Sequence, residues 1–574
     1  MKLIFRYIKP VLWFTVFTLF VKLIGSLMEL TIPMIFDYLL SSVVPKRSLT
    51  LILIWGGVMI LAALLTMLLN IVANRMASKV ARDVAENVRH DLFKKITSLS
   101  GNRVDRFGIP SLEARLTSDT YNIHNVVGMT LRMGVRAPIF FIGSIICTLI
   151  LDPTLTLVML STVPFLGIVI VYITKRGIPL YTRVQENVDG VTRVVREDAQ
   201  GIRVIKALSK GEYERRRFDR VNRDLISSEC RAGVAMALSN PALNVIMNLG
   251  MVFVIIVGAI RVSDGKMHPA TIIAFTQYFT HMSNAMMSIS RIFTRLTKGG
   301  ASGDRIQEVL ETDSGLALEG EDQYPRRDEL PYVTFDRVSF SYNKTKNNLS
   351  EISFTLGKGK TLGVIGATGS GKTTLLNLLM RFYDPDEGGV YIEGRDVRTI
   401  PQEELHAKFG VVMQNDFLFA ETVRENIDFG RGLSDEAIAR AARAAQAEEF
   451  ISGFPEGYQH LLTSKGTNVS GGQKQRLLIA RALANSPEIL ILDDSSSALD
   501  YKTDANLRAA MREMCTDTTT VIVAQRVSSI MHADLILVLD EGEIIGSGTH
   551  EELLRSCTIY REISDSQLGG AILE

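Results

Sequence analysis

The chain has 574 residues, enough for several domains, and its 63 basic and 62 acidic residues almost cancel. This balance argues against a nucleic-acid-binding protein, which would carry a surplus of basic residues. The mean hydropathy is +0.17, and the apolar residues concentrate before residue 300. We therefore expect a membrane-spanning first half and a second half outside the bilayer. The four cysteines have no metal-ligand spacing and indicate isolated thiols.

Residues 1–10 form a short basic, amphipathic stretch, which predicts an interfacial helix on the inner membrane face. Six apolar segments follow, each near the ~20 residues that cross hydrocarbon as a helix. They cover residues 11–36, 51–74, 133–151, 154–174, 241–260 and 269–290. The predicted domains are a six-helix, all-α transmembrane domain (11–297), a polar linker (298–330), an α/β domain (331–566) and a tail (567–574).

The distribution of Lys and Arg predicts the orientation of the spans. Residues 75–125 hold nine of them and residues 175–235 hold fourteen, whereas the opposite loops hold few. The positive-inside rule then places both long loops, both termini and the C-terminal half in the cytoplasm. We expect the membrane to be the plasma membrane. The long loops have helical periodicity, so the helices should continue past the bilayer. We expect turns near Arg115–Tyr121 and near Gly201–Tyr213.

Polar side chains recur at helical spacing inside the predicted spans, where they are costly and usually functional. Lys22 and Glu29 share one face of the first span. The candidate cavity residues on the fifth and sixth spans are Asn244, Asn248, Gln277, His281, Asn284 and Met287. A polar, methionine-containing lining with few fixed charges would suit amphipathic ligands. The alternative is hydrogen bonding between helices of the bundle.

The segment Gly366–Thr374 reads GATGSGKTT and matches the phosphate-loop pattern G-x-x-x-x-G-K-[ST]. Its glycines let backbone N–H groups surround a phosphate, its Lys contacts the outer phosphates, and its Thr offers a hydroxyl to Mg²⁺. An apolar strand (Leu362–Ile365) precedes it and a helix (Leu375–Phe382) follows. The candidate ATP-binding residues here are Gly366, Ala367, Thr368, Gly369, Ser370, Gly371, Lys372, Thr373 and Thr374.

Two further pieces follow in the C-terminal half. Ile489–Asp493 is an apolar strand that ends in an acid, and Asn468–Arg476 (NVSGGQKQR) is a Ser-Gly-Gly turn that opens a helix. With the six spans, these pieces resemble the half-size exporters of the ATP-binding cassette (ABC) family over essentially the whole chain. The resemblance implies ATP and Mg²⁺ as cofactors.

The resemblance assigns roles to individual residues of this chain. Tyr342 matches the aromatic residue that stacks on adenine, and Gln414 matches the Q-loop residue. Thr373, Gln414 and Asp493 match the groups around Mg²⁺. The signature motif, which serves a partner's ATP, corresponds to Ser470, Gly471, Gly472 and Gln473, and the D-loop residue to Asp500. The two expected turns between the long helices match coupling helices.

Two positions depart from the family pattern at the catalytic centre. Asp494 stands where most active cassettes have Glu beside the Walker B residue Asp493, and Gln525 stands where they have the switch His. Asp withdraws the carboxylate by one methylene, and a misplacement of about 1 Å can cost roughly a hundredfold in rate. Gln cannot carry an imidazolium charge. Both changes predict a site that holds ATP but hydrolyses it slowly.

Because ABC cassettes work as head-to-tail pairs, the resemblance implies a second half-transporter as partner. The intact signature beside a weakened catalytic centre predicts the degenerate subunit of a bacterial heterodimeric multidrug exporter. Its other expected partners are membrane lipid and an amphipathic small-molecule substrate, with no nucleic acid. The alternatives are a homodimeric lipid or peptide exporter and an ATP-gated sensor without transport.

Overall fold

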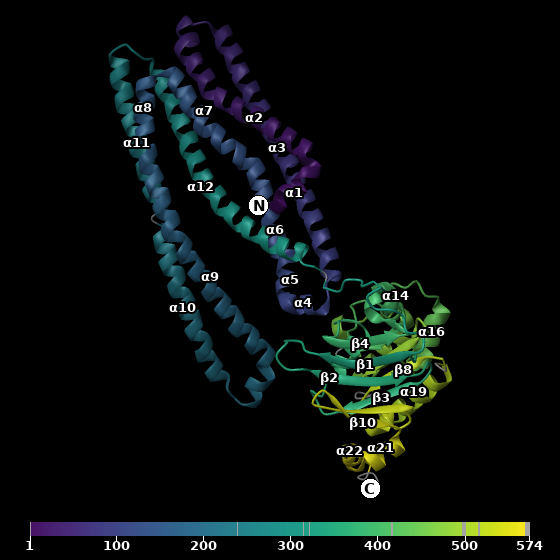
Figure 1. Cartoon of the computed structure of the whole chain (residues 1–574). Helices are drawn as coiled ribbons and strands as arrows, with labels where there is room; N and C mark the ends of the chain where they lie inside the picture. Colours follow the sequence, from purple (N-terminus) through teal and green to yellow (C-terminus); the bar gives the residue numbers. More distant parts are fainter. Residues whose placement is uncertain are drawn as a thin grey trace. The chain divides into compact units, whose positions relative to one another are not determined.

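In the computed structural model the chain divides into two compact units, each described separately below (Figure 1). The helical unit comprises residues 1–97 and 110–312, and the α/β unit comprises residues 98–109 and 313–574. The structure describes residues 2–237, 239–313, 315–320, 322–414, 417–495, 501–514 and 517–568.

Long helices dominate the helical unit, and α9 and α10 pack side by side (Figure 1). The α-helices are α1 (Lys2–Ile8), α2 (Leu12–Tyr38), α3 (Leu49–Thr97), α5 (Ile109–Ala114), α6 (Thr120–Met129), α7 (Val135–Leu151), α8 (Pro153–Ser161), α9 (Val163–Ala207), α10 (Gly211–Ala237), α11 (Ser239–Ser263) and α12 (Pro269–Glu311). Two π-helical turns, η4 (Arg115–Asp119) and η5 (Thr130–Gly134), connect α5, α6 and α7. A third π-helical turn, η2 (Leu39–Val43), follows α2, and η1 (Lys9–Val11) and η3 (Val44–Lys46) are 3₁₀ turns.

Five helical stretches among the described residues are long and apolar enough to cross a membrane. They are Lys2–Lys46, Leu49–Thr97, Ile109–Leu151, Pro153–Ala207 and Pro241–Ser263, and each contains one predicted span. Many of their large apolar side chains face outward, such as Trp13, which is 87% exposed. Helix faces that expose apolar side chains are suited to contact with the hydrocarbon of a membrane. The predicted sixth span lies within α12, a 43-residue helix of more mixed composition, and its crossing stays a prediction.

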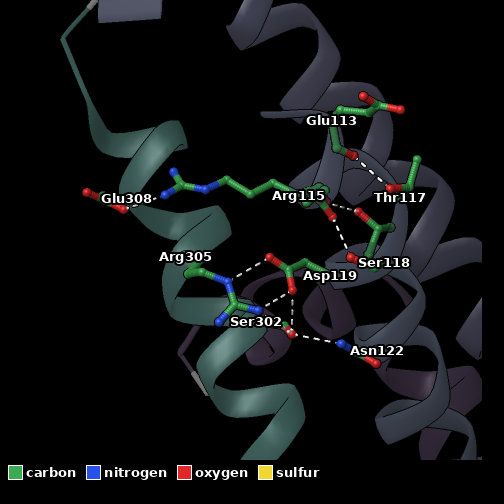
Figure 2. A network of polar contacts seen from close by, with 11 residues as sticks. Glu113, Arg115, Thr117, Ser118, Asp119, Asn122, Ser302, Arg305 and Glu308 are labelled. Carbon is green, nitrogen blue, oxygen red and sulfur yellow. Dashed lines mark hydrogen bonds and ion pairs between the residues drawn. The ribbon is translucent and has the colours of Figure 1, made fainter. Parts of the chain in front are cut away.

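One of the two predicted turns is wrong, and polar contacts with the C-terminal part of α12 show why. The segment Arg115–Asp119 is not a turn but the π-helical η4, and its side chains reach toward α12 (Figure 2). Ser302 donates to the buried Asp119 carboxylate at 2.8 Å, and Arg305 Nε donates to it at 2.8 Å. Arg115 forms an ion pair with Glu308 at 2.9 Å. The prediction was wrong because the polar residues bind another helix instead of facing solvent.

The true turn after the long α3 lies about ten residues earlier. There the chain forms the short α4 (Gly101–Phe107), which ends at Gly108 with φ +75°. The other predicted turn is confirmed, since α9 ends at Ala207 and α10 begins at Gly211. Helix α12 continues through Gly299, where the expected linker begins. A Cβ on Gly299 would lie 2.2 Å from Val126 Cγ2, so this glycine permits close helix packing instead of breaking the helix.

The α/β unit contains two sheets. One is antiparallel, with strand order β2-β1-β4-β5, and the other has the order β10-β9-β3-β8-β7-β6, in which β9, β3, β8, β7 and β6 are parallel neighbours. The strands are β1 (Val333–Phe340), β2 (Leu349–Leu356), β3 (Thr361–Gly366), β4 (Glu387–Ile392), β5 (Arg395–Asp396), β6 (Phe409–Val412), β7 (Ile489–Asp493), β8 (Thr519–Val523), β9 (Leu535–Asp540) and β10 (Glu543–Gly548).

Most helices of this unit pack into one of three hydrophobic cores, one of which joins α20, α21 and α22 to β9. Helix α13 packs into a core shared by both sheets, whereas α15, α16 and α18 form a second core beside β6 and β7. The α-helices are α4, α13 (Lys372–Leu379), α14 (Gln402–Ala407), α15 (Val423–Asp428), α16 (Asp435–Ala444), α17 (Glu448–Ser452), α18 (Gly471–Leu483), α19 (Tyr501–Met514), α20 (Val527–Ile530), α21 (His550–Ser556) and α22 (Thr558–Leu568). The fold class is therefore as predicted.

Candidate functional site

Three neighbouring parallel strands carry the predicted catalytic residues at their carboxyl ends. Strand β3 leads into the phosphate loop, β7 ends at Asp493, and β8, between them, precedes Gln525. Ligands of open parallel sheets bind outside this edge. Asp494 N donates to Val523 O at 2.9 Å, which fixes the residue after β7 against β8. The strand order therefore assembles one site from distant segments of sequence.

The phosphate loop has the backbone that its glycines predict. Gly369 and Gly371 have φ of +88° and +100°, a region that L side chains rarely adopt. A Cβ on Gly366 would lie 2.1 Å from the Leu539 carbonyl oxygen. The Ser370 hydroxyl is buried without a hydrogen-bond partner among the described residues. A glycine cradle with an unsatisfied hydroxyl beside it fits a bound phosphate.

Lys372 begins α13, and its ammonium lies at the loop. Its Nζ donates to the carbonyls of Gly366 and Ala367 at 2.8 and 2.7 Å. Burial lowers the pKa of Lys372, while the charges of Asp493 and Asp494 act in the opposite direction. A phosphate would further stabilise the charged form, because an opposite charge favours ionisation.

The hydroxyl of Thr373 and the carboxylate of Asp493 converge, with Oγ1 and Oδ2 3.3 Å apart. Asp493 is buried, and this burial raises its pKa, as does the charge of Asp494. A hydroxyl and a buried carboxylate are oxygen ligands of the kind that Mg²⁺ uses, directly or through water. These two residues therefore fit a nucleotide-bound Mg²⁺. Gln414, exposed after the end of β6, was the third predicted member.

Asp494 and Gln525, the two departures from the family pattern, contact one another. Gln525 Nε2 donates to Asp494 Oδ2 at 3.0 Å. Asp494 has φ +51°, so its backbone is left-handed immediately after β7. Burial raises the pKa of Asp494, although Arg526 and Lys372 oppose the shift. One carboxylate oxygen thus accepts a side-chain amide instead of being wholly available to a water molecule.

Tyr342, the predicted adenine-stacking residue, is 38% exposed and lies near the phosphate loop. Its hydroxyl is 3.5 Å from Thr374 Oγ1 and accepts a hydrogen bond from Asn377. Its ring packs edge-to-face on Tyr383 with centroids 5.0 Å apart. A cavity of about 350 Å³ adjoins it.

The short α4 also reaches this cavity, a feature that the sequence analysis missed. Ser100 and Arg103 help to line it, and Asp105 accepts a hydrogen bond of 2.8 Å from Tyr383, the neighbour of Tyr342. The sequence contains only a weak indication of this helix: six residues of helical composition lie between Ser100–Gly101 and Gly108. Motif spacing therefore did not reveal this contact to the aromatic cluster.

The signature turn is well formed but separate from the phosphate loop. Ser470 caps α18 in a capping box: its hydroxyl accepts from Gln473 N, and Gln473 Oε1 accepts from Ser470 N at 2.9 Å. Gly471 is exposed and Gly472 half-buried. Among the described residues, no hydrogen bond joins this turn to Gly366–Thr374. Asp500 of the predicted D-loop lies outside the described residues.

The helical unit holds two adjoining cavities. One, of about 170 Å³, includes His281, Asn284 and Ser288 in its lining. The other, of about 680 Å³, is lined by five basic side chains: Lys22, Arg132, Arg136, Arg291 and Arg295. The expectation of few fixed charges was therefore wrong. The remaining candidates do not line either cavity: Asn244, Asn248 and Gln277 are exposed, and Met287 is half-buried.

Comparison with known proteins places this geometry in a family. Residues 15–286 match the ABC transporter transmembrane region, and residues 349–497 match the ABC transporter family. The chain is 35% identical over 567 residues to the uncharacterized ABC transporter ATP-binding protein YfiB of Bacillus subtilis, covering 98% of each chain. The chain belongs to the ABC transporter family, with one transmembrane region and one ATP-binding domain.

Two further relatives add to the comparison. A Mycobacterium tuberculosis protein named fatty acid ABC transporter ATP-binding/permease protein is 32% identical over 483 residues, which are 83% of this chain and 75% of that protein. The solved structure of a bacterial Atm1-family ABC exporter with ATP bound superposes with a TM-score of 0.82 at 25% identity. It covers 96% of this chain and 98% of the other. The exporter fold is therefore shared along nearly the whole chain.

Proposed function

We propose that the chain is one subunit of a heterodimeric ABC exporter in a plasma membrane. Its own Walker motifs form a low-turnover ATP site, and its signature turn completes the partner's active site. ATP binding closes the paired cassettes and turns the spans outward, and hydrolysis at the partner's site resets them. The observation that carries this proposal is the contact between Asp494 and Gln525.

Both residues of that contact weaken hydrolysis for separate reasons. The shorter Asp494 holds its carboxylate back from an attacking water, and the amide of Gln525 occupies one of its oxygens. Gln525 also lacks the ionisable ring that could stabilise developing charge on the γ-phosphate. Binding does not depend on either group, because the glycine loop, Lys372 and Thr373 retain the geometry of a phosphate and Mg²⁺ site.

The separation of signature and phosphate loop supports a dimer. Ser470 and its turn belong to the helices of the second core, whereas α13 packs into the core shared by the sheets. Each motif therefore needs a counterpart from another cassette. The proposed cargo is amphipathic, with multiple drugs as the broad prediction. The relative named as a fatty acid transporter supports amphipathic cargo of a narrower kind.

The test uses the purified complex with a second half-transporter that carries Glu and His at the two changed positions, sought first in the neighbouring reading frame. Replacing the partner's catalytic Glu with Gln should abolish ATP turnover, whereas Asp494→Asn should leave at least about half of it. Asp493→Asn in this chain is the matched control for disturbing Mg²⁺ binding at the same site. Equal loss from the first two changes contradicts the asymmetric model and favours a homodimer-like enzyme.

A further inference from the structure

The larger cavity of the helical unit gathers basic side chains from helices far apart in sequence. Lys22 comes from α2, Arg132 from η5, Arg136 from α7, and Arg291 and Arg295 from α12. None of the described residues that line this cavity is acidic, and its volume of about 680 Å³ lies within the ~300–1,000 Å³ typical of small-molecule sites. The rest of its lining is two Asn and two Met residues.

The charges of this cluster are only partly compensated. Arg136 forms an ion pair with Glu29 at 2.7 Å. Within the described part of the chain, Arg132 and Arg291 donate to neutral oxygens, Gly128 O and Ser288 Oγ. Positive charges held close together repel one another. An anion that enters the cavity is attracted to them and relieves this repulsion.

Lys22 is the deepest member of the cluster. It is only 3% exposed, and its ammonium donates to Asn70 Oδ1 at 2.7 Å and Asn74 Oδ1 at 3.2 Å. Two neutral amides hold the charged group in place without cancelling its charge. A buried lysine within a span is costly and is usually retained for a functional reason.

Snorkelling toward the cytoplasmic interface explains some of these residues but not the cluster. Arg291 and Arg295 follow the sixth predicted span, where basic residues commonly face the interface. Lys22, however, lies near the middle of the first predicted span and is buried. Interfacial preference does not require side chains from three separate segments to line the same cavity.

The smaller cavity continues the larger one, and half of its lining residues are apolar. The two share Met133 and Arg136 in their linings. Beyond them the small cavity is lined by the apolar Ala137, Phe140 and Ala285 on one hand and by the polar His281, Asn284 and Ser288 on the other. Arg136 lies 4.8 Å from the centroid of the Phe140 ring, so the charged and apolar surfaces meet at this point. The pair of cavities matches a molecule with an anionic head and an apolar tail.

We propose that the basic cavity binds the anionic headgroup, carboxylate or phosphate, of a lipid-like amphiphile, whose tail enters the smaller cavity. Arg132, Arg291 and Arg295 supply N–H donors suited to either oxyanion, and Lys22 adds a point charge. This narrows the proposed cargo from amphipathic molecules in general to anionic ones. It rests on the proposed export function only for the direction of transport.

The experiment measures binding without nucleotide or partner, so it is independent of the test of asymmetric hydrolysis. The probe is cis-parinaric acid added to the full chain in neutral maltoside micelles, with energy transfer from the two tryptophans as the signal and empty micelles as blank. The acid should bind at least about tenfold tighter than its methyl ester, because only the acid offers an anionic head. Equal affinity for acid and ester overturns the proposal.

Variants locate the binding in the cavity. Arg132→Gln and Arg295→Gln should each weaken the acid about tenfold without changing the ester. Arg132→Lys should recover part of the loss, and Lys266→Gln, which removes an exposed cation outside the cavity, is the matched control. Should Arg132→Gln fail to fold, the exposed Arg295 keeps the test decisive. Unchanged acid affinity in Arg295→Gln, or equal loss in Lys266→Gln, overturns the proposal.

Competition separates the two sources of an anionic head. Displacement of the probe by palmitate but not by phosphatidylglycerol identifies free monoacyl carboxylates as the ligand class. Displacement by phosphatidylglycerol identifies anionic phospholipid. Displacement by phosphatidylcholine as effectively as by either of these contradicts anion selectivity.

Discussion

The nucleotide site and the basic cavity are both suited to anions, yet they neutralise charge differently. At the nucleotide site, backbone N–H groups and Lys372 face the buried Asp493 and its neighbour Asp494, so acids and a cation share one small volume. In the cavity, five cations line the wall, and one of them, Arg136, forms an ion pair with Glu29.

This contrast indicates what each site must do. A site with its own acids requires Mg²⁺ to accept a triphosphate, so its affinity depends on the metal. A site with cations alone attracts an anion without a metal, and it can release the anion once its walls move apart. The first arrangement suits a nucleotide that is held, and the second suits cargo that must leave.

The largest expected effect comes from restoring the family residues at the nucleotide site. The double variant Asp494→Glu, Gln525→His should raise single-turnover hydrolysis at this chain's own site by about 10²–10⁴-fold, the usual worth of a well-placed general base. Rapid-quench measurement with radiolabelled ATP in the purified complex provides the readout. The same double change made with Lys372→Ala is the control and should show no gain. An unchanged rate with Lys372 intact would mean that these residues do not limit turnover.

Removing the lysine of the phosphate loop should separate the two anion sites. Lys372→Ala should weaken the binding of a fluorescent ATP analogue by about 10–100-fold, because the phosphates of the nucleotide lose one or two charge-assisted hydrogen bonds from the lysine ammonium. Binding of cis-parinaric acid to the cavity should stay within about twofold. Lys360→Ala, which removes an exposed cation just before β3, is the matched control. A comparable loss at the cavity would show that the two sites are coupled without nucleotide.

The polar network at the C-terminal part of α12 should affect stability more than it affects either site. Asp119→Asn leaves Arg305 with a weaker partner and should lower the unfolding free energy by about 1–3 kcal/mol, seen as a lower Tm in detergent. Exposed pairs contribute little, so Arg217→Gln, which removes the pair with Glu197, should leave Tm unchanged. A Tm equal to that of the unmodified protein in Asp119→Asn contradicts a structural role for the network (Figure 2).

The smallest expected effect is a shift in pH dependence at the nucleotide site. Because burial raises the pKa of Asp493, protons compete with Mg²⁺ at a higher pH than they would for an ordinary aspartate. The gain in ATP-analogue affinity on adding Mg²⁺ should therefore decline as the pH falls from 7 toward 5. Titration with and without Mg²⁺ measures this gain, and Asp493→Asn should reduce it at every pH. A gain that is constant down to pH 5 would contradict the raised pKa.

The two anion sites also differ in how far sequence predicts them. The phosphate loop occupies nine consecutive residues, and its partners Asp493 and Gln525 follow strands whose motifs are short and ordered, so spacing located them. The basic cavity is assembled by tertiary packing of α2, η5, α7 and α12. Lys22 was visible as an odd residue in a span, but nothing in the sequence related it to Arg291. Only the packing of the helices shows that these basic residues line one cavity.

Periodicity failed for a related reason at Arg115–Tyr121 and beyond. The polar residues there suggested a turn. A π-helical turn has a wider coil than an α-helix, so its residues do not follow the α-helical spacing by which a helix is predicted. The extension of α12 past Gly299 was missed because glycine usually breaks helices, and close packing against Val126 is a property of the folded bundle.

The π-helical turn η5 has a consequence for how the cavity wall tolerates changes of chain length. Such a turn holds one more residue than an α-helical turn, so it absorbs that residue while the helix on either side keeps its facing. Deleting one residue from Thr130–Gly134 would return the turn to α-helical geometry and leave Arg136 on the cavity side of α7. The same deletion within α7 itself, where the helix is α-helical, would rotate the residues that follow by about 100°.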